Sequence, residues 1–111
     1  MYIIGSTKVD KYGRVLLSGL IDHKETPKVI AVIDTAYSDL KFGIAIALFP
    51  SDEDDDFGLP ITVDDKNRVV LPRWIRDELG PKTQKMYLAV DKDSRGMMKF
   101  LLIQINAPVE E

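Results

Sequence analysis

Two short segments of the chain repeat one pair of charged residues at one spacing. In VDKYGRVLL, Asp10 precedes Arg14 by four positions, and in VDDKNRVVL, Asp64 precedes Arg68 by four. An aspartate placed in this way can accept hydrogen bonds from turn amides and from the guanidinium, which it then orients. The outer edge of an oriented guanidinium suits a phosphate or a base edge of DNA. A pair that only stabilises its own turn is the alternative, and the sequence leaves both readings open.

The residues between the paired charges indicate the shape of each turn. Gly13 and Asn67 hold equivalent positions, 54 residues apart, and both residue types tolerate a positive φ angle. A three-residue hairpin loop with a bulge requires such a residue at this place. We therefore expect Asp10, Gly13, Asp64 and Asn67 to structure two β-hairpin turns. Tyr12, at the first tip, is expected to lie on its own strand.

Other basic residues surround these turns. The residues that we expect to bind nucleic acid are Lys8, Lys11, Arg14, Lys66, Arg68, Arg73 and Arg76. For Lys8 and Lys11 a purely solubilising role is equally open, and Arg73 faces either DNA or solvent. Trp74 is expected in packing or in an oligomer contact. The single histidine, His23, is expected at the surface.

The elements that must position these residues follow the same order in each half of the chain. Alternating apolar and polar residues predict strands on both sides of each turn, STKVD and RVLLS in the first half and PITVD and RVVLP in the second. PRWIRDELG predicts a short helix, because Pro72 suits the first helical position and Ile75 and Leu79 share a face. SGLIDHKETP is the equivalent helix of the first half, weakened by Gly19.

Two further strands are expected in each half, KVIAVIDTA and FGIAIALF in the first and KMYLAVD and MMKFLLIQI in the second, joined by the hairpin loops YSDLK and KDSRG. Each half, 1–50 and 61–111, is then a ββαββ unit that is too small to bury its own apolar face. We expect one cooperative domain, mainly β with short helices, in which the two units form a pseudo-two-fold barrel or sandwich. Self-association, as a dimer or a ring, would extend such an arrangement.

Composition and charge exclude several classes of protein. A chain of 111 residues that is 45% apolar and 30% charged suits one folded domain, and the absence of cysteine excludes a disulfide scaffold or a thiolate metal site. The formal net charge is −3, but SDEDDDFG carries five acidic residues, and the remaining chain sums to +2. We interpret 51–60 as an acidic linker rather than a calcium site, because the glycine of an EF-hand loop is displaced to Gly58 and Val63 stands where that loop needs a bidentate glutamate. No metal or cofactor is expected.

Other classes are excluded by missing patterns. No apolar run approaches the roughly 20 residues of a membrane helix, and no signal peptide is recognised, so we expect a cytoplasmic protein with no membrane contact. The single histidine and the scattered serines and aspartates form neither a nucleophile elbow nor a phosphate-binding loop. The sequence therefore does not indicate an enzyme.

KVDKYGRVLL and TVDDKNRVVLPRWIRDELG resemble the N-terminal motif of the AbrB family of swapped-hairpin DNA-binding proteins, in which V-D-x-x-G-R-V-x-x-P leads into a short helix ending in L-G. Two copies in one chain are similar to the MraZ branch of this SpoVT-AbrB superfamily. The resemblance covers 8–20 and 61–80 well and the other strands only by their order. It implies interleaved hairpins forming a β platform, and a transcriptional regulator or antitoxin-like repressor that binds double-stranded DNA through arginines.

Carried over by position, Arg14 and Arg68 match the turn arginine of the family, and Arg76 matches a basic residue of the helix. The first half departs from the pattern, since Asp22 is equivalent to Arg76 and Ser18 replaces the proline after the second strand. We therefore expect the first half to contribute less to DNA contact. A protein-interaction module, or an antitoxin-like component with little DNA binding, is the alternative, and the acidic total favours it.

Overall fold

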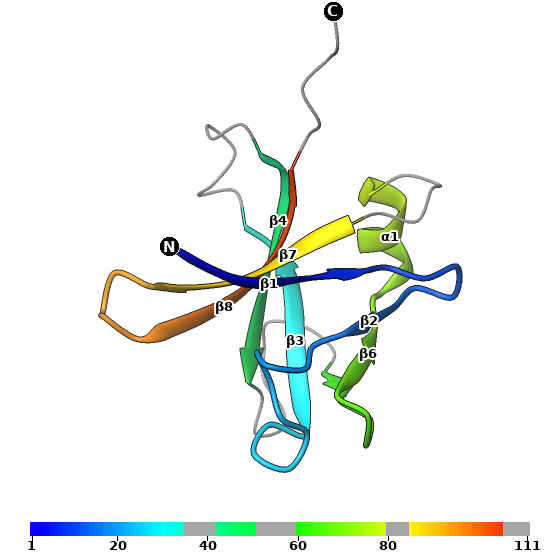
Figure 1. Cartoon of the computed structure of the whole chain (residues 1–111), viewed down its shortest axis with the longest axis horizontal. Helices are drawn as coiled ribbons and strands as arrows, with labels where there is room; N and C mark the ends of the chain where they lie inside the picture. Colours follow the sequence, from blue (N-terminus) through cyan, green and yellow to red (C-terminus); the bar gives the residue numbers. More distant parts are fainter. Residues whose placement is uncertain (35–41, 51–59, 80–84, 106–111) are drawn as a thin grey trace, which may run out of the picture.

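The computed structural model of the chain describes residues 1–34, 42–50, 60–79 and 85–105 (Figure 1). These ranges form a mainly β protein whose strands are β1 (Tyr2–Lys8), β2 (Arg14–Leu16), β3 (Lys28–Ile33), β4 (Phe42–Pro50), β5 (Ile61–Thr62), β6 (Arg68–Val70), β7 (Lys85–Lys92) and β8 (Met98–Ile105). Their single helix is α1 (Arg73–Leu79). In the part of the chain so described, no helix has the length and apolar character that a membrane span requires. The expected loop YSDLK and nearly all of the acidic linker lie outside these ranges.

Six strands form one antiparallel sheet in the order β1-β7-β8-β4-β3-β5. At its centre β4 pairs with β8, and Ala47 lies opposite Leu101. Towards the two edges, β1 pairs with β7 and β5 pairs with β3. The sheet twists strongly, so that β3 and β4 run across the direction of β1 and β7 in Figure 1. Within the described ranges β1 and β5 are its edges, so this sheet is open and the expected closed barrel is not observed.

The two short strands β2 and β6 form a separate antiparallel ribbon that joins the two hairpins. Val15 lies opposite Val69 at its centre. Beyond the strands, the Leu17 amide donates to the Asn67 carbonyl at 2.7 Å, and the Leu71 amide donates to the Gly13 carbonyl at 2.9 Å. The backbone just after each second strand is thus bonded to the turn of the other hairpin.

The apolar positions of the repeated segments lie in the main core. In both copies the three apolar residues shared by the repeats are buried, together with the isoleucine that follows them; these residues are Val9, Val15, Leu17, Ile21, Val63, Val69, Leu71 and Ile75. They pack against the face of the sheet that carries Leu48, Leu88 and Leu102. Burial accounts for the apolar part of the repeat, whereas the repeated Asp and Arg residues need another explanation.

The helix expected after the second hairpin is confirmed. The Pro72 carbonyl accepts bonds of 3.0 Å from the amides of Ile75 and Arg76, and Ile75 and Leu79 are the buried residues of α1. The Pro72 ring suits the N-terminus of the helix because its fixed φ is helical and it needs no amide partner there. The two features from which the helix was predicted, the apolar i, i+4 pair and the proline at its start, are therefore both found in the structure.

The helix expected in SGLIDHKETP is wrong. This segment consists of two isolated turns, in which the Leu17 carbonyl accepts from the amides of Leu20 and Ile21 and the Asp22 carbonyl from the following residues. Gly19 has a φ of 88°, far from the helical value, so the backbone leaves the helical path at once. Leu20 and Ile21 are nevertheless buried, which shows that the apolar contacts survive without the helix.

Candidate nucleic-acid interface

The first hairpin turn is built around Asp10. One carboxylate oxygen accepts bonds from the amides of Tyr12 (2.9 Å) and Arg14 (2.8 Å), and the other accepts from Arg14 Nε (2.7 Å). The Asp10 amide donates to the Arg14 carbonyl, and the Gly13 amide returns to the Asp10 carbonyl, each at 3.0 Å. Gly13 has a φ of 82°, as the turn requires. The turn-structuring roles expected of Asp10 and Gly13 therefore have a geometric basis.

The second hairpin turn repeats these contacts around Asp64. Its carboxylate accepts from the amides of Lys66 (2.9 Å) and Arg68 (2.8 Å) and from Arg68 Nε (2.9 Å). Asn67 adopts a φ of 61°, which asparagine tolerates better than most residues. Hydrogen bonds from the Arg68 and Lys66 amides outweigh partial desolvation and hold the pKa of Asp64 below its usual value. At Asp10 desolvation is the largest effect and acts upwards, but bonds from Arg14 and Tyr12 together lower the pKa.

A third turn, between β7 and β8, has the same backbone hydrogen bonds. The Asp93 carboxylate accepts from the amides of Arg95 (2.8 Å) and Met97 (3.0 Å), and Gly96 has a φ of 82°. Hydrogen bonding, mainly from the Met97 amide, lowers the pKa of Asp93. Here methionine occupies the position of the turn arginine. An Asp-x-x-Gly turn in this protein therefore closes without an arginine four residues after the aspartate.

The aspartates leave part of each arginine accessible. Each contact uses Nε, which is one of five N–H donors of the guanidinium. The Arg14 side chain is 40% exposed and the Arg68 side chain 32% exposed. The guanidinium is thus fixed along one edge, and the donors of its outer edge remain suited to a phosphate or to a purine base edge.

Arg76 of α1 lies against the tip of the first hairpin. Its Nη1 donates to the Tyr12 carbonyl at 3.4 Å, and a Cβ atom added at Gly13 would lie 2.8 Å from Arg76 Nε. Gly13 therefore suits both its φ and this close approach, because an added Cβ would displace the end of the Arg76 side chain. Within the described ranges Arg76 Nε is buried without a hydrogen-bond partner. The sequence placed Arg76 on the helix but did not predict that it contacts the other hairpin.

His23 holds the tip of the second hairpin. The Asn67 side-chain oxygen accepts the His23 amide at 2.8 Å and also contacts His23 Nδ1 at 2.9 Å. Because an amide oxygen only accepts, this contact requires a proton on Nδ1. Asp22 Oδ1 lies 3.4 Å from the same Nδ1 atom. His23 is half-buried rather than freely exposed, and the asparagine at a positive-φ position was the feature of the sequence that could have indicated this contact.

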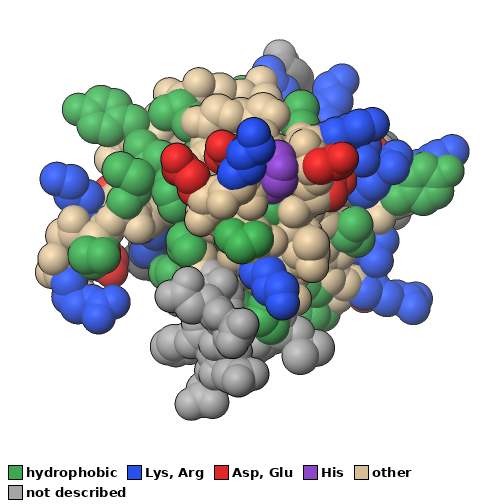
Figure 2. Space-filling view, turned by 90° about the horizontal axis from the view of Figure 1, so that it is seen from below, with side chains coloured by type: hydrophobic (Ala, Val, Ile, Leu, Met, Phe, Trp, Pro, Cys, Tyr) green, Lys and Arg blue, Asp and Glu red, His purple; other side chains and the backbone are tan. Residues whose placement is uncertain are grey.

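The remaining predicted residues lie around these two tips. Lys8 ends β1 opposite Lys85, and the exposed Lys11 has its Nζ 5.1 Å from the centre of the Tyr12 ring. Lys66 is exposed at the second turn, and Arg73 is exposed at the start of α1. In Figure 2, Lys and Arg side chains gather at the end of the molecule where Figure 1 places the β1–β2 hairpin, with a smaller group at the opposite end.

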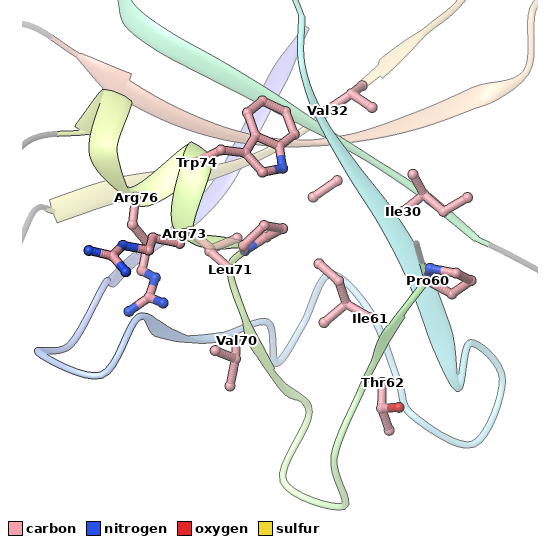
Figure 3. A pocket seen from close by; sticks show the side chains of 12 residues that line it. Ile30, Val32, Pro60, Ile61, Thr62, Val70, Leu71, Arg73, Trp74 and Arg76 are labelled. Atoms are coloured by element: carbon pink, nitrogen blue, oxygen red, sulfur yellow. The ribbon is translucent and has the colours of Figure 1, made fainter. Parts of the chain in front are cut away.

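A groove of about 740 Å³ adjoins α1. It lies between β3, the start of β5 and the segment from β6 into α1, and Val32, Ile61 and Pro60 contribute to its walls. Figure 3 shows Trp74 over β3, while Arg73 and Arg76 point the other way, towards the β1–β2 hairpin. Trp74 is 54% exposed, so it is not a core residue. No cluster of three or more metal-ligating side chains occurs in the described ranges.

Comparison of the chain with known protein families, with curated proteins and with solved structures finds no match.

Proposed function

We propose that this chain is a DNA-binding transcriptional regulator of AbrB-like type. Its two turn arginines contact phosphates or base edges of duplex DNA, assisted by the lysines of the turns and by the arginines of α1. The observation that carries the proposal is that Asp10 and Asp64 each hold the Nε of an arginine four positions later. The same turn type closes with methionine at that position in the Asp93 turn, where Arg95, two positions after the aspartate, lies 3.6 Å from the carboxylate. Because the turn closes without an arginine at that position, a ligand contact is an additional reason for both copies to carry one there.

The proposal includes an internal repeat with a pseudo-two-fold axis. Support comes from the strand registers. Val15 opposes Val69 and Ala47 opposes Leu101, and the partners in both pairs are 54 positions apart, like the repeated segments. The bonds from the Leu17 amide to the Asn67 carbonyl and from the Leu71 amide to the Gly13 carbonyl are also equivalent, since their donors and their acceptors are each 54 positions apart. One axis through both pairs accounts for all of these spacings.

The proposal also includes an exchange of strands between the units 1–50 and 61–111, with the acidic linker 51–60 between them. In support, β1 of the first unit pairs with β7 of the second, and β5 of the second pairs with β3 of the first. Such an exchange is what a swapped-hairpin arrangement means. It brings the two arginine-bearing turns into one cooperative domain.

The experiment that tests the DNA proposal is fluorescence anisotropy of the full chain with duplex fragments from its own upstream region, at low and near-physiological salt. We expect saturable binding that Arg14→Ala with Arg68→Ala abolishes. In single variants, removal of one phosphate contact should also lower the slope of log K against log salt by about 0.9. Unchanged affinity in the double variant would show that the proposed face is wrong.

A matched control removes the same charge from the opposite end of the molecule. Lys92 and Arg95 are exposed at the β7–β8 hairpin, away from the arginine-bearing turns. Lys92→Ala with Arg95→Ala therefore lowers the net charge equally and should preserve most of the affinity. Equal losses in both double variants would indicate general attraction by charge rather than a specific face.

A protein-interaction module or antitoxin-like component is the second candidate function. The acidic total charge favours it, as does the groove beside α1 with Trp74 half-exposed at its wall. Self-association as a dimer or ring is compatible with either function, because β1 is an edge strand that exposes Tyr2, Ile3 and Ile4. Absence of DNA binding at both salt concentrations would favour this candidate.

A further inference from the structure

The two tips carry opposite charge balances, although their turns have the same backbone. We define the first tip as residues 10–14 with Arg76, and the second tip as residues 64–68 with Asp22 and His23. The first tip holds three cations and one carboxylate, which are Lys11, Arg14, Arg76 and Asp10. The second holds two cations and three carboxylates, which are Lys66, Arg68, Asp22, Asp64 and Asp65. With a formal charge of +2 at the first tip and −1 at the second, a phosphate backbone is attracted more strongly to the first.

The difference is largest at one equivalent pair of positions. Arg76 and Asp22 are 54 residues apart, and each belongs to the segment that follows its own second strand. Arg76 reaches the first tip through the Tyr12 carbonyl, and Asp22 approaches the second tip through His23. Equivalent places beside the two turns are thus filled by a cation at one tip and by an anion at the other.

The first tip also has a tyrosine ring against its arginine, at a position that is a lysine in the second tip. Tyr12 is 57% exposed, and Arg14 Cζ lies 4.9 Å from the centre of its ring. The Arg14 guanidinium is therefore held by Asp10 along one edge and by the Tyr12 ring across one face. The residue equivalent to Tyr12 is Lys66, and within the described ranges the Arg68 guanidinium is held by Asp64 with no ring contact beside it. A guanidinium fixed in two directions is the better base reader, because its donors are already oriented.

We infer that the chain recognises an asymmetric, non-palindromic duplex element, with the first tip reading bases and the second tip making only a weak backbone contact. This inference rests on the proposed DNA-binding function. A two-fold protein with equal tips matches a palindromic site, since the symmetry of a site mirrors that of its reader. Unequal tips remove that requirement. From the sequence pattern we expected the first half to contribute less to DNA contact. In this inference the first half instead contacts the bases, assisted by Arg76 from the second half.

The test compares the two arginines separately in the full chain. Duplexes bound by the wild-type protein are first selected from a random-sequence pool, and the preferred element is then used in anisotropy titrations of Arg14→Met and Arg68→Met. Methionine is the replacement because Met97 occupies this position in the third turn, which closes normally. We expect a non-palindromic element, a loss of about tenfold or more for Arg14→Met, and a loss of about threefold or less for Arg68→Met.

A transplant provides a second readout that does not depend on loss of binding. Asp65→Lys with Lys66→Tyr gives the second tip the Lys-Tyr pair of the first, and both positions are exposed. We expect this variant to gain affinity for a palindrome built from the preferred element. A palindromic selected element, or equal losses for the two Arg→Met variants, would overturn the inference and leave the proposed function standing. Absence of any binding by the wild-type protein would overturn both.

Discussion

Substitution of Gly13 by alanine should destabilise the protein more than the same substitution in the matched turn at Gly96. Both glycines have a φ of 82°, so both alanines are held in the left-handed region. They differ in their surroundings, because a Cβ at Gly13 meets the Arg76 side chain, whereas a Cβ at Gly96 meets no atom within 4 Å. The pair therefore separates backbone strain from steric contact.

The magnitude follows from these two contributions. The left-handed conformation costs an alanine about 1–2 kcal/mol, and this cost applies equally to both sites. At Gly13 the alanine must also displace Arg76 and break its hydrogen bond to the Tyr12 carbonyl, which adds about 1 kcal/mol. We expect a loss of about 2–3 kcal/mol for Gly13→Ala and about 1–2 kcal/mol for Gly96→Ala. For a domain of this size, the difference corresponds to about 4 °C in Tm.

Urea unfolding followed by circular dichroism measures both losses as changes in the free energy of unfolding. Repeating Gly13→Ala in an Arg76→Ala background gives a double-mutant cycle, in which the excess should disappear. If the two glycine variants lose equal stability, or if the excess persists without Arg76, then Arg76 does not pack on the first turn. The same result would remove Arg76 from the first tip.

Three further predictions concern acid stability, the core and the linker. The lowered pKa values of the turn aspartates stabilise the fold above their ordinary value of 3.8, and this contribution is lost as the pH falls through the folded pKa. The urea midpoint of unfolding should therefore drop as the pH falls from about 5 to 2. The drop should be less steep when all three aspartates are changed to asparagine, and an equally steep drop would exclude these turns as the cause. Ile75→Ala, at a fully buried position of α1, should lower the free energy of unfolding by about 2–5 kcal/mol, and a loss below about 1 kcal/mol would contradict the packing described. Asp→Asn at 54–56, outside the described residues, should tighten non-specific DNA binding because three negative charges are removed, and an unchanged affinity would refute that electrostatic role.

The strands were predictable because their signals are local. Alternation and β-branched residues marked a part of every strand, but β1 begins at Tyr2, four residues before the predicted segment STKVD. Gly13 and Asn67 marked two turns correctly by their tolerance of positive φ. The helix α1 followed from Pro72 and an apolar i, i+4 pair. The third turn, at Asp93, has the same Asp-x-x-Gly spacing as the first turn, so the same sequence rule predicts its geometry.

The contacts between distant segments were not predictable. Periodicity says which residues of a strand are buried, but it does not say which strand is the neighbour, and β1 pairs with β7 rather than with an adjacent segment. The contacts of Arg76 with the first turn and of His23 with Asn67 depend on that arrangement. The expected helix in the first half failed for a local reason, because Gly19, whose low helix propensity already weakened the expectation, adopts a positive φ.

The pairing of β1 with β7 has a consequence for synthesis of the chain. Tyr2 lies opposite Val90, so β1 is synthesised 88 residues before the strand with which it pairs. At about 5–20 residues per second, that interval is roughly 4–18 s. During it the apolar residues Ile3 and Ile4 have no strand beside them, and an unpaired apolar strand is prone to association with other chains. Nascent chains of this protein should therefore depend on chaperones until translation reaches β7.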